Sequence, residues 1–70
     1  MNDKHNNDLV LIDRWAVIKM LGISESTLER LMVKDSNFPM PRRIGSRSIR
    51  WLKHEVEAYI QGLIPVDYFA

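Results

Sequence analysis

The sequence predicts a single small domain that is mainly α-helical and carries one small β-hairpin. Three observations lead to this prediction. Two capped helical segments are separated by a very short turn, a proline- and arginine-rich stretch follows them, and a third helical segment completes the pattern. The chain has 70 residues and no cysteine. A compact apolar core must therefore hold it together, without help from disulfides or thiolate-bound metal.

The chain is expected to divide into a disordered lead over residues 1–8, a folded domain over 9–64 and a tail over 65–70. The lead, MNDKHNND, is polar and lacks the apolar region of a secretory signal. No apolar run approaches the roughly 18 residues of a membrane span, so we expect a cytoplasmic protein with no membrane partner. The short apolar run from Leu9 to Ile12 is either a strand or an entry into the core.

The first two helices are predicted from their capping residues. Asp13 is suited to accept hydrogen bonds at the start of a helix from about Arg14 to Leu21, which Gly22 ends in the left-handed conformation. Ser24 is suited to cap a second helix from about Glu25 to Lys34. So short a connection forces the two helices to cross steeply, as in a helix-turn-helix.

The second helix has a buried stripe and an outward one. The apolar residues at helical spacing are expected to face the core, and they are Leu28, Leu31 and Met32. The residues left facing outward are Ser26, Glu29, Arg30 and Val33.

The stretch FPMPRRIGSRSIRW, residues 38 to 51, is predicted to be an extended loop followed by a β-hairpin. Pro39 and Pro41 hold the chain extended, and a loop of two to four residues is expected to start at Gly45. One strand face is expected to carry Ile44, Ile49 and Trp51, and the other Arg43, Ser48 and Arg50. The window from Ser36 to His54 contains no acid, so the hairpin presents positive charge.

The third helix is predicted from about Lys53 to Gln61, with Gly62 as its C-terminal cap and Pro65 preventing continuation. Its apolar residues recur at helical spacing, and they are Leu52, Val56, Tyr59, Ile60 and Leu63. Trp15 and Trp51 are expected to lie in the core or at its edge, rather than to stack on bases.

Helix, turn, helix and basic hairpin together predict a winged helix-turn-helix. Such a unit places its second helix in the DNA major groove, and the arginines of the wing suit phosphate oxygens. Double-stranded DNA is thus the expected partner. The candidate DNA-binding residues are Ser26, Thr27, Arg30 and Lys34 on the second helix and Arg42, Arg43, Arg47 and Arg50 in the hairpin.

These residues resemble a known family. LIDRWAVIKMLGISESTLERLM, FPMPRRIGSRSIRW and HEVEAYI, in this order, look like the AlpA-type regulators of phages and prophages, which are MerR-like and related in fold to excisionases. The resemblance implies binding to promoter or attachment-site DNA without a cofactor, to regulate prophage genes or to assist excision. Its pattern matches Ser26, Thr27 and Arg30 in the second helix and Arg43, Arg47 and Arg50 in the wing. Glu25 and Glu29 depart from it, because the family often has a basic and an aromatic residue there.

Other function classes fit the sequence less well. No His, Asp or Glu residues have metal-ligand spacing, no serine has a plausible triad, and so small a chain barely forms a core beside a catalytic pocket. We therefore expect no enzyme, no metal and no cofactor. One small module reads few base pairs, so several copies on repeated sites, or a partner such as a recombinase or RNA polymerase, are expected. The rival class is a protein-interaction module, in which Tyr68 and Phe69 of the tail dock in a groove.

Overall fold

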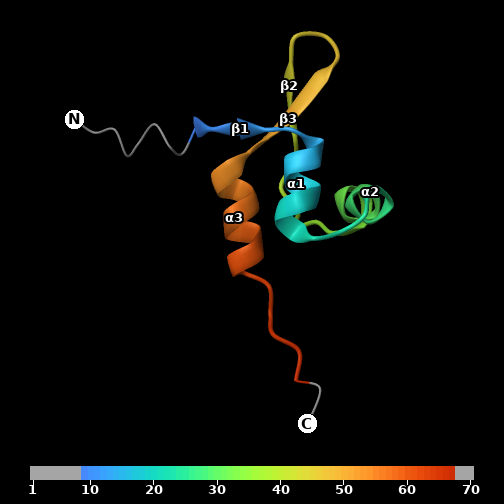
Figure 1. Cartoon of the computed structure of the whole chain (residues 1–70), viewed down its shortest axis with the longest axis vertical. Coiled ribbons are helices and arrows are strands. Elements are labelled where there is room, and N and C mark those ends of the chain that lie inside the picture. The colour runs from blue at the N-terminus through green and yellow to red at the C-terminus, as the bar shows by residue number, and fades with distance from the viewer. Residues whose placement is uncertain (1–8, 68–70) are drawn as a thin grey trace, which may run out of the picture.

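The computed structural model describes residues 9–67, which form three helices and three short strands (Figure 1). In chain order these are β1 (Leu11–Ile12), α1 (Arg14–Leu21), α2 (Glu25–Lys34), β2 (Arg42–Ile44), β3 (Ser48–Leu52) and α3 (Lys53–Gln61). All three helices have the predicted bounds. The predicted disordered lead, residues 1–8, lies outside the described residues, as do residues 68–70 of the tail.

The helix-turn-helix is fixed by its capping residues. The Asp13 carboxylate accepts a hydrogen bond from the backbone N–H of Ala16 at 2.9 Å, and the Ser24 hydroxyl accepts one from the N–H of Thr27 at 3.1 Å. Gly22 ends α1 with φ at 67°, and its N–H donates to the carbonyl of Ile18. Because only glycine adopts this left-handed backbone without strain, this residue turns the chain directly into α2.

The sheet has three antiparallel strands in the order β1-β3-β2. The run before Asp13, for which the sequence left two readings open, forms strand β1 and pairs Ile12 with Trp51. Strands β2 and β3 form the predicted hairpin, which projects from the helical body away from the C-terminal end (Figure 1). The fold is thus the predicted winged helix-turn-helix, with an added edge strand.

The predicted faces of the hairpin are wrong for β2. Arg43 is opposite Ile49 and Ile44 is opposite Ser48, and directly paired residues share a face of the sheet. Arg43 therefore lies on the face of Ile49 and Trp51, whereas Ile44 lies on the other face and is 44% exposed. The cause is the loop of residues 45–47, since a change of one residue in its length moves every β2 side chain to the opposite face.

The core lies where the helices meet the sheet. Among residues 9–67, five are buried, namely Val17, Leu28, Phe38, Trp51 and Val56. The Trp51 indole N–H donates to the carbonyl of Pro39 at 3.1 Å, which satisfies the one polar atom of that side chain. The core prediction is confirmed for Trp51 but wrong for Trp15, which is 63% exposed because it lies on α1 away from Val17.

Candidate nucleic-acid interface

Helix α2 is anchored by one face and exposes the other. Leu28 is fully buried, and Leu31 and Met32 pack against the core. The four residues predicted to face outward are all exposed, and they are Ser26, Glu29, Arg30 and Val33. In Figure 1, α2 and α3 lie on opposite sides of α1. The helix is therefore held firmly while its polar face stays open to a partner.

Three hydroxyl groups gather at the start of α2. The Ser24 hydroxyl donates to Thr27 Oγ1 at 3.0 Å and lies 3.3 Å from the Ser26 hydroxyl oxygen. A helix start presents free backbone N–H groups and the positive end of the helix dipole. Ser26 and Thr27 thus lie at the end of α2 that favours an anionic oxygen.

Arg14 pairs with both carboxylates of α2 and offsets part of their charge. Its Nη1 atom lies 3.4 Å from Glu25 Oε2 and 3.4 Å from Glu29 Oε2. Sequence reasoning missed this residue, although a signal was present. A cation in the first turn of α1 interacts unfavourably with the helix dipole. Its presence there indicates that the guanidinium pairs with an acid outside α1. The pairing draws both acids to the flank of α2 that faces the start of α1.

The cations of α2 are differently placed. Within residues 9–67, neither Arg30 nor Lys34 has an acidic partner, and both are exposed. Their charge is available on the face that the core leaves open. A helix presenting a free guanidinium in this way can form paired hydrogen bonds to a base edge or to a phosphate.

The hairpin carries four arginines with different surroundings. Arg42 and Arg50 are directly opposite each other, so they share one face, and Arg43 lies on the other. Arg43 donates to the carbonyl of Ser46 at 3.3 Å and Arg50 to the carbonyl of Ile49 at 2.8 Å. Neither bond removes charge, because a carbonyl is neutral. Arg47 is exposed in the loop and has no acidic partner in the described part of the chain.

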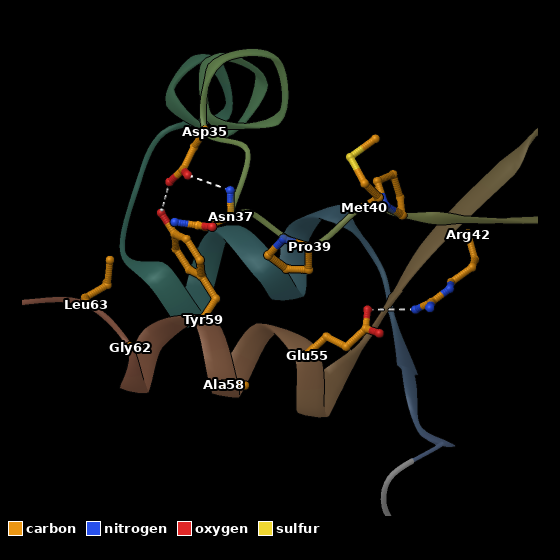
Figure 2. Close-up of a pocket in the computed structure, with 11 residues that line it drawn as sticks. Asp35, Asn37, Pro39, Met40, Arg42, Glu55, Ala58, Tyr59, Gly62 and Leu63 are labelled. Atoms are coloured by element: carbon orange, nitrogen blue, oxygen red, sulfur yellow. Dashed lines mark hydrogen bonds and ion pairs between the residues drawn. The ribbon is translucent and has the colours of Figure 1, made fainter.

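Arg42 is the exception among the predicted wing residues. Its Nη1 atom lies 2.7 Å from Glu55 Oε1 at the start of α3 (Figure 2). The pair directs this guanidinium toward α3 and offsets its charge. The hairpin therefore has three cations that no described carboxylate neutralises, namely Arg43, Arg47 and Arg50.

A hollow of about 660 Å³ lies between α3 and the loop that joins α2 to β2 (Figure 2). Met40 and Leu63 contribute apolar surface to it and are 65% and 54% exposed. The Tyr59 hydroxyl donates to Asp35 Oδ2 at 2.8 Å. Burial, together with this hydrogen bond and the carboxylate charge, raises the pKa of Tyr59 above its usual value of 10.0. The contact ties α3 to the residue that ends α2.

Residues 9–67 contain no group of three or more His, Cys, Asp or Glu side chains placed to hold a metal ion. In the same range, every helix is too short or too polar to cross a bilayer. The features that the described residues do present are thus a cation-bearing helix face, a cation-bearing hairpin and a partly apolar hollow beside α3.

The chain matches a known protein family. The family model described as "Prophage CP4-57 regulatory protein (AlpA)" matches residues 11–63, which begin at β1 and end just beyond α3. No curated protein and no solved structure matches the chain. The matched range includes both the helix-turn-helix and the hairpin, so the whole candidate interface lies within it. The chain therefore belongs to the AlpA family of prophage regulatory proteins.

Proposed function

We propose that this protein is a sequence-specific DNA-binding regulator, in which α2 lies in the major groove and the hairpin contacts the adjoining backbone. The observation that carries the proposal is the exposed Arg30, which has no acidic partner among residues 9–67 and belongs to a helix anchored by the buried Leu28. A helix that reads the major groove needs one face packed on the core and a charged, exposed face toward the DNA. Membership of a prophage regulatory family supports the same function.

Each predicted residue has a role in this proposal. Arg30 reads a guanine, whose O6 and N7 atoms match a guanidinium. Ser26 lies on the same outward face as Arg30 and contacts a base edge. The hydroxyl of Thr27 meets a phosphate near the start of α2. The remaining cations contact the backbone and set the register of binding, and they are Lys34, Arg43, Arg47 and Arg50. Arg42 contributes less, because Glu55 offsets its charge.

The small size of the domain bears on how it finds a site. One such module buries about 600–1,000 Å² on DNA, which reads too few base pairs to specify a genomic position. We propose that several copies bind repeated sites, or that a recombinase or RNA polymerase binds alongside. The protein would act on the nucleoid, in the cytoplasm, without catalysis or a cofactor.

The proposal is tested by selecting bound sequences from a random pool of duplex DNA. We expect one enriched motif that contains a guanine, and we expect Arg30→Ala to lose enrichment at that guanine alone. A pool that shows no enrichment after several rounds would refute sequence-specific binding.

Promoter control is the biological role that we propose first, since the matching family is described as regulatory. The alternative is an excisionase-like role, in which the protein bends attachment-site DNA for a recombinase. A promoter reporter and an in vitro excision assay, each with and without the protein, separate the two. If the protein changes excision but does not affect the promoters of its prophage, the excisionase-like role is favoured over promoter control.

A protein-interaction module is the second candidate function, favoured by the apolar surface around the end of α3. Ile64 and Val66 are 85% and 70% exposed, and Met40 and Leu63 line the hollow beside them. A chain that ends at Leu63 separates the candidates. It should keep full DNA affinity if α2 and the hairpin form the interface, and it should lose its partner if the tail does.

A further inference from the structure

Val33 is the exposed apolar residue of the outward face of α2. It is 82% exposed in the last turn of α2, where three other residues, Leu28, Leu31 and Met32, make the core contacts of the helix. A β-branched side chain is also a poorer helix former than alanine or leucine. Val33 therefore slightly weakens the helix and gains no burial within the domain.

Val33 lies on the same face of α2 as Arg30. Ser26, Arg30 and Val33 are spaced i, i+4 and i+7, so they form one stripe along the outward face of α2. Three residues of helix advance about 4.5 Å, and one base pair of DNA advances about 3.4 Å. A helix in the groove that places Arg30 on one base pair therefore brings Val33 over a base one or two steps away.

We propose that Val33 recognises a thymine through its 5-methyl group, one or two base pairs from the guanine read by Arg30. This inference rests on the proposed function. The thymine methyl is the apolar group on the base edges of the major groove. The two methyl groups of valine are fixed in one main rotamer within a helix, so little side-chain freedom is lost when they cover it.

The neighbours of Val33 favour a base rather than an apolar protein surface. Glu29 precedes it by one turn on the same face, and Arg30 and Lys34 lie next to it on the helix. Glu29 pairs with Arg14, which draws its carboxylate to the flank of α2 and offsets part of its charge. A single methyl-bearing side chain among charged residues suits one apolar point in a polar groove. It does not suit the extended apolar patch that a protein partner buries.

The test uses the full chain and the selected DNA site, with each thymine replaced in turn by deoxyuridine, which lacks only the methyl group. We expect one replacement near the guanine to weaken binding about fourfold, the effect of one buried methyl group. Val33→Ala should weaken binding to the unmodified site by a similar factor and should no longer respond to that replacement. Val66→Ala is the matched control, since it removes the same atoms from an exposed valine outside α2 and should bind and respond as the wild type does.

The outcomes distinguish this inference from the function on which it rests. If Arg30-dependent selection of guanine is found but no deoxyuridine replacement weakens binding, Val33 does not read a methyl group and the proposed function stands. The inference also fails if Val33→Ala, folded by circular dichroism, keeps the same loss on replacement. If no sequence is selected at all, both proposals fall together.

Discussion

At the scale of single residues, the two arginines Arg30 and Arg47 are expected to act differently although neither has an acidic partner within residues 9–67. Arg30 lies on the open face of a helix, whereas Arg47 lies in an exposed loop at the end of a hairpin. A helix in the groove reaches base edges, and a loop at the rim reaches phosphates. The same chemical group should therefore give specificity at one position and affinity at the other.

Arg30→Ala should weaken binding to the selected site by about 1–3 kcal/mol and relax the preference at one base pair, because a paired hydrogen bond to guanine is lost. Binding curves on the selected site and on its single-base variants measure both effects. Arg47→Ala is the control and should weaken binding to all of these duplexes equally. An Arg30→Ala variant with unchanged preference would show that another part of the protein reads the base.

Arg14→Gln should weaken DNA binding about two- to fivefold, because it frees the carboxylates of Glu25 and Glu29 to repel phosphate. Lys19→Gln removes the same charge from α1 without releasing either acid, so it should bind nearly as the wild type does. Adding Glu25→Gln and Glu29→Gln to the Arg14 variant should restore affinity. Failure of that rescue would mean that Arg14 acts by contacting DNA itself.

The cations of the candidate site could be predicted from the sequence, but the ion pairs of Arg14 and Arg42 could not. A local excess of arginine and a helical period are visible in the sequence, so the hairpin and the open face of α2 were identified. Arg14 is 15 residues from Glu29 and Arg42 is 13 from Glu55. No sequence spacing predicts contacts over such distances, because they depend on how the elements pack.

At the scale of elements, the features that depend on neighbouring residues, such as helix bounds, could be predicted from the sequence. Asp13, Gly22 and Ser24 act within a few residues of themselves, and α1 begins and ends, and α2 begins, where these caps predicted. The face of Ile44 was predicted wrongly, because it depends on the number of residues in the 45–47 loop. The strand character of Leu11–Ile12 could not be decided locally either, since that strand exists only through pairing with β3.

Gly22→Ala should lower the stability of the domain by about 1–2 kcal/mol, which is the strain of a left-handed backbone in a residue with a Cβ atom. Beyond the adjoining backbone, no heavy atom of the described residues lies within 4 Å of the position that a Cβ would occupy, so the loss is strain of the backbone and not a clash. For a domain of this size, each kcal/mol lowers the melting temperature by about 4–8 °C. Gly22→Asn should lose less, as asparagine tolerates this conformation better.

Tyr59→Phe tests the link between α3 and the end of α2. At neutral pH the variant should be less stable by about 1 kcal/mol, because it lacks the hydroxyl that donates to Asp35. The pKa of Tyr59 is raised in the folded state, so the folded protein holds this proton more tightly than the unfolded chain does. Its contribution is therefore complete below about pH 10 and is lost as the pH rises further.

Urea unfolding of both proteins at pH 7 and at steps above pH 10 measures this effect. The difference between them should shrink with rising pH, because the phenolate that forms is repelled by Asp35. Comparison with Tyr59→Phe cancels the titration of all other groups. If the difference in free energy of unfolding stays constant to high pH, the hydrogen bond from the Tyr59 hydroxyl to Asp35 does not stabilise the fold.

At the scale of the whole molecule, the proposed function depends on charge distribution more than on net charge, which is only +1. Two carboxylates of α2 and one of α3 are paired within the fold, while the cations on the outer face of α2 and in the hairpin loop are not paired by any described acid. A nearly neutral chain can thus present a positive surface. The excess of arginine in the hairpin is visible in the sequence, whereas the pairing of the acids of α2 and α3 appears only when the elements pack together.

Salt dependence follows from that surface. With about four to six phosphate contacts, affinity for DNA should fall roughly 10²–10³-fold between 50 and 200 mM salt. Titrations at several salt concentrations give the slope of log affinity against log salt, and Arg47→Ala should reduce that slope by about one. A slope near zero would favour the protein-interaction module instead.

The two tryptophans differ in their environment, since Trp15 is largely exposed to water and Trp51 is buried in the core. The protein therefore carries two intrinsic fluorophores that should emit at different wavelengths, one sensitive to what approaches the surface and one to the integrity of the interior. With Trp15→Phe, the remaining emission would follow unfolding alone. Subtracting it from the wild-type spectrum would isolate the signal of ligand approach near α1, without attaching any dye.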